Sequence, residues 1–214
     1  MYTLYTFWRS SAAYRVRLAL SLKDIAYEAA CVNLVRDGGE QHAAAYRAIH
    51  PLGRVPALVT PHGTLTQSQA IIEYLEEAHP LPALLPPDGF GRARVRALAA
   101  TIACDIHPLN NTSVLARLRA QFGADEHAVN AWYRHWVEAG LKGVEALLRE
   151  DATGTFCHGD APGMADCFLV PQVYNARRFG VDLAPFPRLA AASAYLETLP
   201  AFAAARPEAQ PDAE

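Results

Sequence analysis

The chain has 214 residues, a length that suits either one large domain or two smaller ones that share an interface. Hydrophobic residues make up 51% of it, charged residues make up 19%, and the formal net charge is -3. This balance supports a sizeable core without disulfides and argues against a nucleic-acid-binding protein, which usually carries a basic excess.

No stretch approaches the run of about 20 apolar residues that spans a bilayer. The N-terminus, MYTLYTFWRSS, lacks the charged and apolar regions of a signal peptide. The four cysteines lie far apart without a C-x-x-C pair, which argues against a zinc site and for free thiols in a reducing compartment. We therefore expect a cytoplasmic protein without a membrane or metal partner.

The first part of the chain alternates between strand and helix signals. Residues 2–7 and 27–32 are rich in β-formers, and the segment opened by Ser10 and Ser11 has apolar residues at helical spacing up to Lys23. We then expect a helix over 38–49, a hairpin over 57–66 and a helix from Ser68 to about His79. A β-α-β unit requires parallel strands with a right-handed crossover, so this order predicts a small mixed sheet covered by helices.

The second part is predicted to be an all-helical bundle. Pro80, Pro82, Pro86 and Pro87 interrupt all periodicity and indicate a linker over 81–89, between domains at 1–80 and 90–214. Helical patterns follow at 92–119, with a kink at Pro108, and at 125–149, 164–179 and 187–199. The tail from Arg206, rich in alanine, proline and acidic residues, is expected to be loose.

Several local motifs resemble those of one enzyme family. Residues 9–17, RSSAAYRVR, resemble the signature Ser-Ser-Cys-x-Trp-Arg-Val-Arg of the zeta-class glutathione transferases, the family of maleylacetoacetate isomerase. Further similar segments lie at 33–41, 54–58, 67–68, 108–115, 164–173, 178–183 and 210–212. The chain departs from the pattern in three places: Ala12 replaces the cysteine of the family, Tyr14 its tryptophan, and Gly163 the threonine that caps a helix.

The resemblance implies a thioredoxin-like N-terminal domain followed by a helical-bundle C-terminal domain, the glutathione-transferase fold, in a homodimer. It also implies glutathione as cofactor and a small diacid as substrate. The expected reaction is the cis–trans isomerisation of maleylacetoacetate, in which the glutathione thiolate adds reversibly to the double bond, so that no protein cysteine is needed at position 12. Glutathione transferase activity is a further expectation.

Ser10 and Ser11 are the implied catalytic pair, since a hydroxyl and the positive end of a helix stabilise a thiolate. Taken from the residues alone, a plain N-cap is the favoured interpretation of the two serines, and the resemblance reverses this order. Arg9 and Arg178 are chosen as the cations for the diacid. The residues expected to hold glutathione are Ser10, Ser11, Ala12, Arg15, Gln41, Val55, Gln67, Ser68, His107, Asn111, Thr112 and Ser113.

The resemblance implies these residues, and local geometry is consistent with it at three places. A cis peptide before Pro56 would present the N–H and carbonyl of Val55 to the tripeptide like an added strand. Gln67 and Ser68 sit where a helix begins, which is a ready carboxylate site. His107 and Asn111 lie four positions apart and would share a face of the kinked helix.

Two alternatives stay open. Maleylpyruvate isomerase runs the same chemistry on a shorter diacid, and some relatives of that kind carry arginines directly after the paired asparagines, where this chain has Thr112 and Ser113. This difference favours maleylacetoacetate. The other alternative is a non-catalytic glutathione-binding protein, which the missing cysteine would suit but Ser10, Gln67 and Ser68 would not.

Overall fold

The computed structural model describes residues 1–150 and 152–214, which form two compact units. The first unit comprises Met1–Leu84 and Glu197–Glu214, and the second comprises Leu85–Leu196. Residues 197–214, which the sequence analysis grouped with the helical domain, therefore belong to the unit that contains the sheet. No helix in the described residues is long and apolar enough to cross a membrane.

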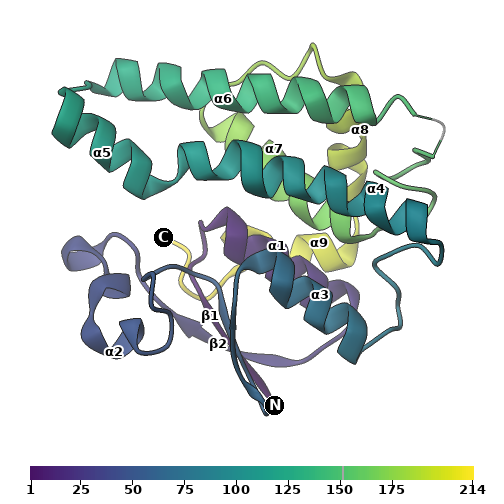
Figure 1. Ribbon diagram of the computed structural model, residues 1–214, viewed down its shortest axis with the longest axis horizontal. Helices are drawn as coiled ribbons and strands as arrows, with labels where there is room; N and C mark the ends of the chain where they lie inside the picture. Colours follow the sequence, from purple (N-terminus) through teal and green to yellow (C-terminus); the bar gives the residue numbers. More distant parts are fainter. Residues whose placement is uncertain (151) are drawn as a thin grey trace. The chain divides into compact units, whose positions relative to one another are not determined.

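The first unit is built on a mixed sheet in the strand order β2-β1-β3-β4 (Figure 1). β1 pairs in parallel with β2 and antiparallel with β3, and β3 and β4 form the predicted hairpin. Its elements are β1 (Tyr2–Thr6), α1 (Ser11–Leu22), β2 (Tyr27–Cys31), η1 (Arg36–Gly38), η2 (Glu40–His42), α2 (Ala44–Arg47), β3 (Ala57–Thr60), β4 (Gly63–Thr66), α3 (Ser68–Ala78), α9 (Pro200–Ala205) and η5 (Pro207–Ala209).

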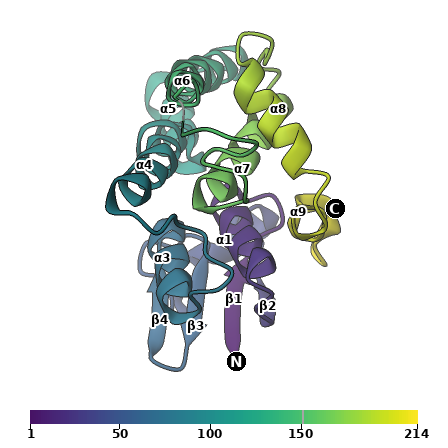
Figure 2. The ribbon, with the colours of Figure 1, turned by 90° about the vertical axis from the view of Figure 1, so that its right-hand side faces the viewer.

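The core of this unit lies between the central strands and the helices. Leu4 in β1 faces Leu58 in β3, and both are fully buried, as are Val16 and Leu20 on α1 and Ile72 on α3. α1 packs against both α3 and α9, as Figure 2 shows. Apolar side chains from the strands and from the helices thus form one buried layer, as predicted for a sheet covered by helices.

The second unit is all-helical, as predicted. Its elements are α4 (Gly89–Ala100), the π-helical segment η3 (Thr101–Ile106), η4 (His107–Asn110), α5 (Thr112–Phe122), α6 (Glu126–Leu147), α7 (Met164–Arg178) and α8 (Pro187–Leu196). α7 is the most buried helix and contacts both α4 and α8. The buried Asp166 in its first turn accepts the N–H groups of Gly163 and Cys157, so the helix start is satisfied although Gly163 has no side chain.

Two predicted helices are broken in the structure. Residues 38–49 contain the end of η1, the turn η2 and the single helical turn α2, because Asp37, Gly38 and Gly39 all have positive φ angles that a helix excludes. The pattern at 92–119 is not one kinked helix. α4 ends at Ala100, a π-helical and a 3-10 segment follow, and Asn111 has an extended backbone before α5 begins.

The expectation of a loose tail was wrong. Pro207 is buried, η5 forms one turn, and the Asp212 carboxylate accepts the backbone N–H of Trp8 at 3.0 Å. Composition predicted exposure at Arg206, Glu208 and Pro211, but it could not show that Pro207 is buried or that Asp212 binds Trp8, 204 positions earlier in the chain.

A buried ion pair lies where α1 and α3 of the first unit end. The Lys23 ammonium lies 2.7 Å from the Glu76 carboxylate and also donates to the carbonyls of His79 and Pro82. Glu76 in turn accepts the N–H of Leu84 at 2.9 Å. The pair therefore joins the ends of α1 and α3 to the proline-rich segment that follows.

We predict that Lys23→Met destabilises the protein by about 3–5 kcal/mol, because it leaves a buried carboxylate and two carbonyls without their cation. Urea unfolding followed by circular dichroism measures the loss. Lys142→Met is the matched control, since Lys142 is exposed on α6 and is the other lysine of the chain. A change below about 1 kcal/mol in Lys23→Met would contradict the assigned role.

Candidate ligand-binding site

The connection between β1 and α1 presents a hydroxyl at the start of a helix. Ser10 is the N-cap of α1, with extended backbone angles, and its Oγ accepts the N–H of Ala13 at 3.2 Å. Within the described residues, the Ser10 hydroxyl donates no hydrogen bond, and the N–H of Ala12 has no acceptor. Ser11 is buried beside them. The helix start can therefore offer a hydroxyl proton and a partial positive charge to an anionic group.

The residue before this serine also has a defined place. The guanidinium of Arg9 lies over the ring of Trp8, 4.9 Å from its centroid, and Arg9 remains half-buried. A cation–π contact of this kind orients the guanidinium without using its N–H donors, so these stay available to a carboxylate.

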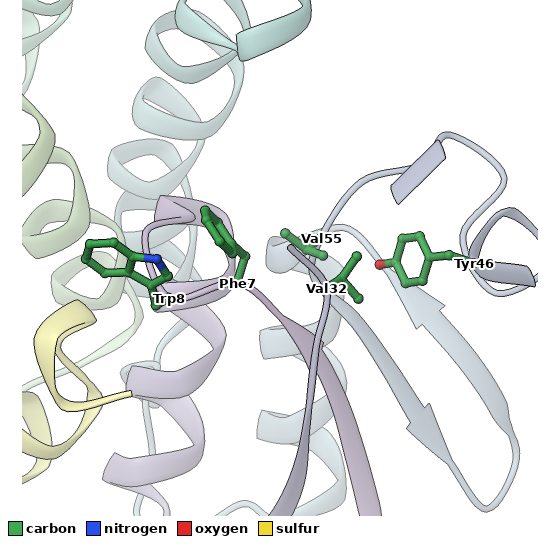
Figure 3. Packing of buried hydrophobic residues seen from close by; sticks show 6 residues of the cluster. Phe7, Trp8, Val32, Tyr46 and Val55 are labelled. Carbon is green, nitrogen blue, oxygen red and sulfur yellow. The ribbon is translucent and has the colours of Figure 1, made fainter. Parts of the chain in front are cut away.

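A single apolar cluster joins three segments that carry predicted site residues. Phe7 and Trp8 at the end of β1, Ala13 on α1, Val32 after β2, Tyr46 on α2 and Val55 before β3 form the cluster (Figure 3). The segments with Ser10, Gln41 and Val55 all begin or end in these contacts. Because close-packed side chains move together, the cluster gives the three segments a common rigid base.

The segment before β3 leaves backbone groups available. The Val55–Pro56 peptide is cis, as the sequence analysis expected. Tyr46 donates its hydroxyl proton to the carbonyl of Arg54 at 2.6 Å, which anchors the segment. In the described part of the chain the N–H and carbonyl of Val55 have no hydrogen-bond partner, although its side chain is buried. Such a pair of groups can bind an extended peptide as a strand would.

The start of α3 is a second helix terminus with available donors. Gln67 has a φ of 70°, an unusual angle for a residue with a side chain, and no side chain caps the helix. Among the described residues, the N–H groups of Ser68, Gln69 and Ala70 have no acceptor. Arg15 reaches this point from α1, with its Nη1 3.3 Å from the Ser68 Oγ. N–H groups, helix dipole and guanidinium all favour a carboxylate here.

Gln41 lies in the loop after β2. Its Nε2 donates to the carbonyl of Leu34 at 3.3 Å, while its Oε1 is buried without a partner in the described residues. Gly39 has a φ of 101°, which favours glycine, and a Cβ there would displace the end of the Gln41 side chain. An unpaired buried acceptor indicates that a donor from a ligand would complete this site.

The remaining candidates lie in the second unit. His107 begins the turn η4, whereas Asn111 is the N-cap of α5, so the prediction that they share a helix face was wrong. The Asn111 Oδ1 accepts both the N–H and the hydroxyl of Ser113, and Thr112 is exposed in the first turn of α5. Arg178 ends α7, with its guanidinium 4.9 Å from the centroid of the Phe179 ring.

In the described residues, the first unit thus has a helix start at α3 whose N–H groups can bind an anion, unpaired backbone groups at Val55 and a hydroxyl at the start of α1. These features suit a short extended peptide with a carboxylate at one end and an anionic group at another. Sequence reasoning missed the supporting residues Arg17, Tyr46 and Asp212, which bind backbone carbonyls or N–H groups beside the site. For Asp212 a signal existed in the motif at 210–212.

Comparison with known proteins gives consistent matches over nearly the whole chain. A family model described as glutathione S-transferase, N-terminal domain matches residues 4–83, and the corresponding C-terminal domain model matches residues 126–198. Maleylpyruvate isomerase of a Ralstonia species is 53% identical over 211 residues, which are 98% of each chain. Maleylacetoacetate isomerase of Pseudomonas aeruginosa is 52% identical over 98% of this chain and 97% of its own.

A solved structure is equally similar. The holo structure of a zeta-class bacterial maleylpyruvate isomerase superposes with a TM-score of 0.96 at 52% identity, covering 99% of this chain and 100% of the other. These matches confirm the expected two-part fold.

The loop before Val55 contains a buried titratable group. His50 is 3% exposed, its Nδ1 has no partner in the described residues, and burial, aided by Arg54, lowers the pKa of His50 below its ordinary 6.5. Because the folded state holds this imidazole neutral, the unfolded state binds the proton first as the pH falls. The stability that His50 contributes is present above its unfolded pKa and decreases below it.

We predict that His50→Asn flattens the decline of stability between about pH 6.5 and about pH 5, because asparagine does not titrate. Urea midpoints of the wild type and the variant across this range measure the difference. Parallel pH profiles for the two proteins would contradict the prediction.

Proposed function

Since the chain belongs to the glutathione S-transferase family, we propose that it is a glutathione-dependent cis–trans isomerase whose substrate is maleylacetoacetate. The observation that carries the proposal is the set of unpartnered groups in the first unit. Val55, the first turn of α3 and Ser10 offer donors and acceptors of the kind that a tripeptide with carboxylates and a thiol requires. A maleylacetoacetate isomerase from Anaeromyxobacter dehalogenans, 48% identical with a TM-score of 0.89, has GSH bound in its active site.

The polar groups described above suit the backbone and the carboxylates of glutathione. We assign the cysteinyl backbone of the tripeptide to the N–H and carbonyl of Val55, in the manner of an added strand. A glutathione carboxylate suits Gln67, Ser68 and the N–H groups of the first α3 turn, with Arg15 as the nearby cation. The unpaired Gln41 Oε1 can accept a hydrogen bond from the ligand.

Bound glutathione supplies a thiolate that adds to the conjugated double bond and leaves again, so that the bond is single long enough to rotate. Ser10 holds that sulfur through its free hydroxyl proton, and the N–H of Ala12 and the α1 dipole favour its ionised form. Ala12 needs no thiol of its own in this scheme. The main contribution of the protein is therefore orientation, which is worth several kcal/mol when reactants are well placed.

A diacid substrate requires cations. Arg9 adjoins Ser10 in the chain and keeps its N–H donors free of its cation–π contact, so we assign one substrate carboxylate to it. Arg178 and the η4–α5 residues His107, Asn111, Thr112 and Ser113 are the candidates that the second unit contributes. We further propose a homodimer in the cytoplasm, following the resemblance to the family.

Maleylpyruvate is the second candidate substrate, since a maleylpyruvate isomerase is among the most similar relatives. The exposed Thr112 and Ser113 at the start of α5 favour maleylacetoacetate, because neutral side chains there provide no extra cation for the carboxylate of a shorter diacid.

We predict that Ser10→Ala lowers kcat/KM about 100-fold or more with maleylacetone in the presence of glutathione, because one preorganised donor to the reacting sulfur is lost. Loss of absorbance of the conjugated substrate measures turnover, and calorimetry measures glutathione affinity. Asp125→Ala is the matched control, since Asp125 caps α6 through the same kind of bond, to the Ala128 N–H at 2.8 Å.

Both variants lose an N-cap worth about 1 kcal/mol, so only an effect confined to Ser10→Ala reports on chemistry. Full activity in Ser10→Ala would remove this serine from the mechanism. Glutathione binding by the wild type without turnover of either diacid would instead identify a non-catalytic glutathione-binding protein.

We predict that the double variant Thr112→Arg/Ser113→Arg shifts the preference toward maleylpyruvate by about tenfold in the ratio of kcat/KM values, because two added cations favour the more compact dianion. Parallel assays of maleylacetoacetate and maleylpyruvate with wild type and variant measure the ratio. A wild type that already prefers maleylpyruvate would overturn the substrate assignment.

A further inference from the structure

The C-terminal tail binds the connection between β1 and α1. In Figure 1 the tail runs from α9 back past the end of β1, and the Asp212 Oδ2 accepts the backbone N–H of Trp8 at 3.0 Å. The tail is further anchored by the buried Pro207, and by Gln210, whose side chain donates to the carbonyls of Ala204 and Arg206. Trp8 is the residue immediately before Arg9 and Ser10.

A buried arginine holds the same connection from its other side. Arg17 is 1% exposed. Its guanidinium donates to the Thr6 hydroxyl and to the carbonyls of Phe7, Trp8 and Ala205, at 2.9 to 3.3 Å. Burial lowers the pKa of Arg17 to about 10, and Asp212 is the carboxylate whose charge opposes this shift. Arg17 thus holds the carbonyl of Trp8, and Asp212 holds its N–H.

The two bonds leave the peptide groups around Trp8 little freedom. Trp8 is 8% exposed, and the Arg9 guanidinium lies over the face of its ring. The Ser10 N–H donates to the Phe7 carbonyl at 3.0 Å, so that Ser10 is tied to the same short segment. A shift of the Trp8 backbone would therefore displace both the cation of Arg9 and the hydroxyl of Ser10.

We propose that Asp212 is a positioning residue for the glutathione site. By accepting the Trp8 N–H, it fixes the orientation in which Arg9 and Ser10 face the ligands. This assignment rests on the proposed function for its kinetic consequences. Misplacement of reacting groups by about 1 Å costs about 100-fold in rate, so a single tail contact is sufficient to matter.

The test compares Asp212→Ala with the control Asp182→Ala. In the second unit the Asp182 carboxylate accepts the backbone N–H of Ala184, so the control removes a hydrogen bond of the same kind. Hydrogen exchange of peptides that cover residues 7–13 reports the connection directly, and we expect about tenfold faster exchange in Asp212→Ala alone. We expect kcat/KM with maleylacetone to fall about 10- to 100-fold, chiefly in kcat. Glutathione affinity should change less than about threefold, because Val55 and the α3 terminus are untouched.

Asp212→Asn serves as the conservative variant, because its amide oxygen can still accept the Trp8 N–H, and it should recover most of kcat. An Asn variant as impaired as the Ala variant would overturn the hydrogen-bond assignment. If hydrogen exchange over residues 7–13 were unchanged in Asp212→Ala, the proposal would be wrong. If kcat, glutathione affinity and the unfolding midpoint all fell in equal proportion, Asp212 would be a purely structural residue. A wild type that isomerises neither diacid would refute the proposed function. The hydrogen-exchange rates over residues 7–13 would still test whether Asp212 fixes the Trp8 backbone.

Discussion

The structure of the first unit depends on the hydrogen bonds that the backbone makes at the end of β1. Beyond Thr6 the ladder with β2 and β3 stops, and the carbonyls of Phe7 and Trp8 need other donors. The Arg17 guanidinium provides them from α1, and it also binds the Ala205 carbonyl in α9. A buried cation is tolerated only when its donors are satisfied, so the strand end, α1 and the C-terminal segment are bound to one another by this single group.

That constraint decides where the reactive groups lie. Ser10 caps α1 at the point where the strand end has just been fixed, and its hydroxyl proton is left for a ligand. The apolar cluster that includes Phe7 and Val55 then fixes the segment that carries the available N–H and carbonyl of Val55. Rigid support beneath a few unpaired polar groups is the usual design of a binding site, since unpaired groups on a mobile loop would be hydrated and would bind more weakly.

The second unit uses the same device at a different place. The buried Arg94 on α4 donates to Glu150 and Thr153 at 2.7 Å each, and to the carbonyls of Leu147 and Cys157. It joins the end of α6 to the segment that leads into α7, whose first turn is closed by the buried Asp166. In both units the guanidinium of a buried arginine donates hydrogen bonds to backbone carbonyls that have no partner in a sheet or helix. The arginines of this chain are therefore not confined to its surface.

The sequence alone determined the elements whose signals are local. Richness in β-formers placed β1, short β segments around a turn placed the 57–66 hairpin, and helical spacing placed α1, α3, α6 and α7. The motifs around Ser10, Val55 and Gln67 predicted both the fold and glutathione as the ligand. Only the tertiary structure decided the rest. Positive φ angles at Asp37 to Gly39 broke one predicted helix. The π-helical and 3-10 segments and the extended backbone of Asn111 broke the other, so His107 and Asn111 lie in different elements. Asp212 acquired its partner from the other end of the chain, because a hydrogen bond across 204 positions depends on the folded path and leaves no periodic trace in the sequence.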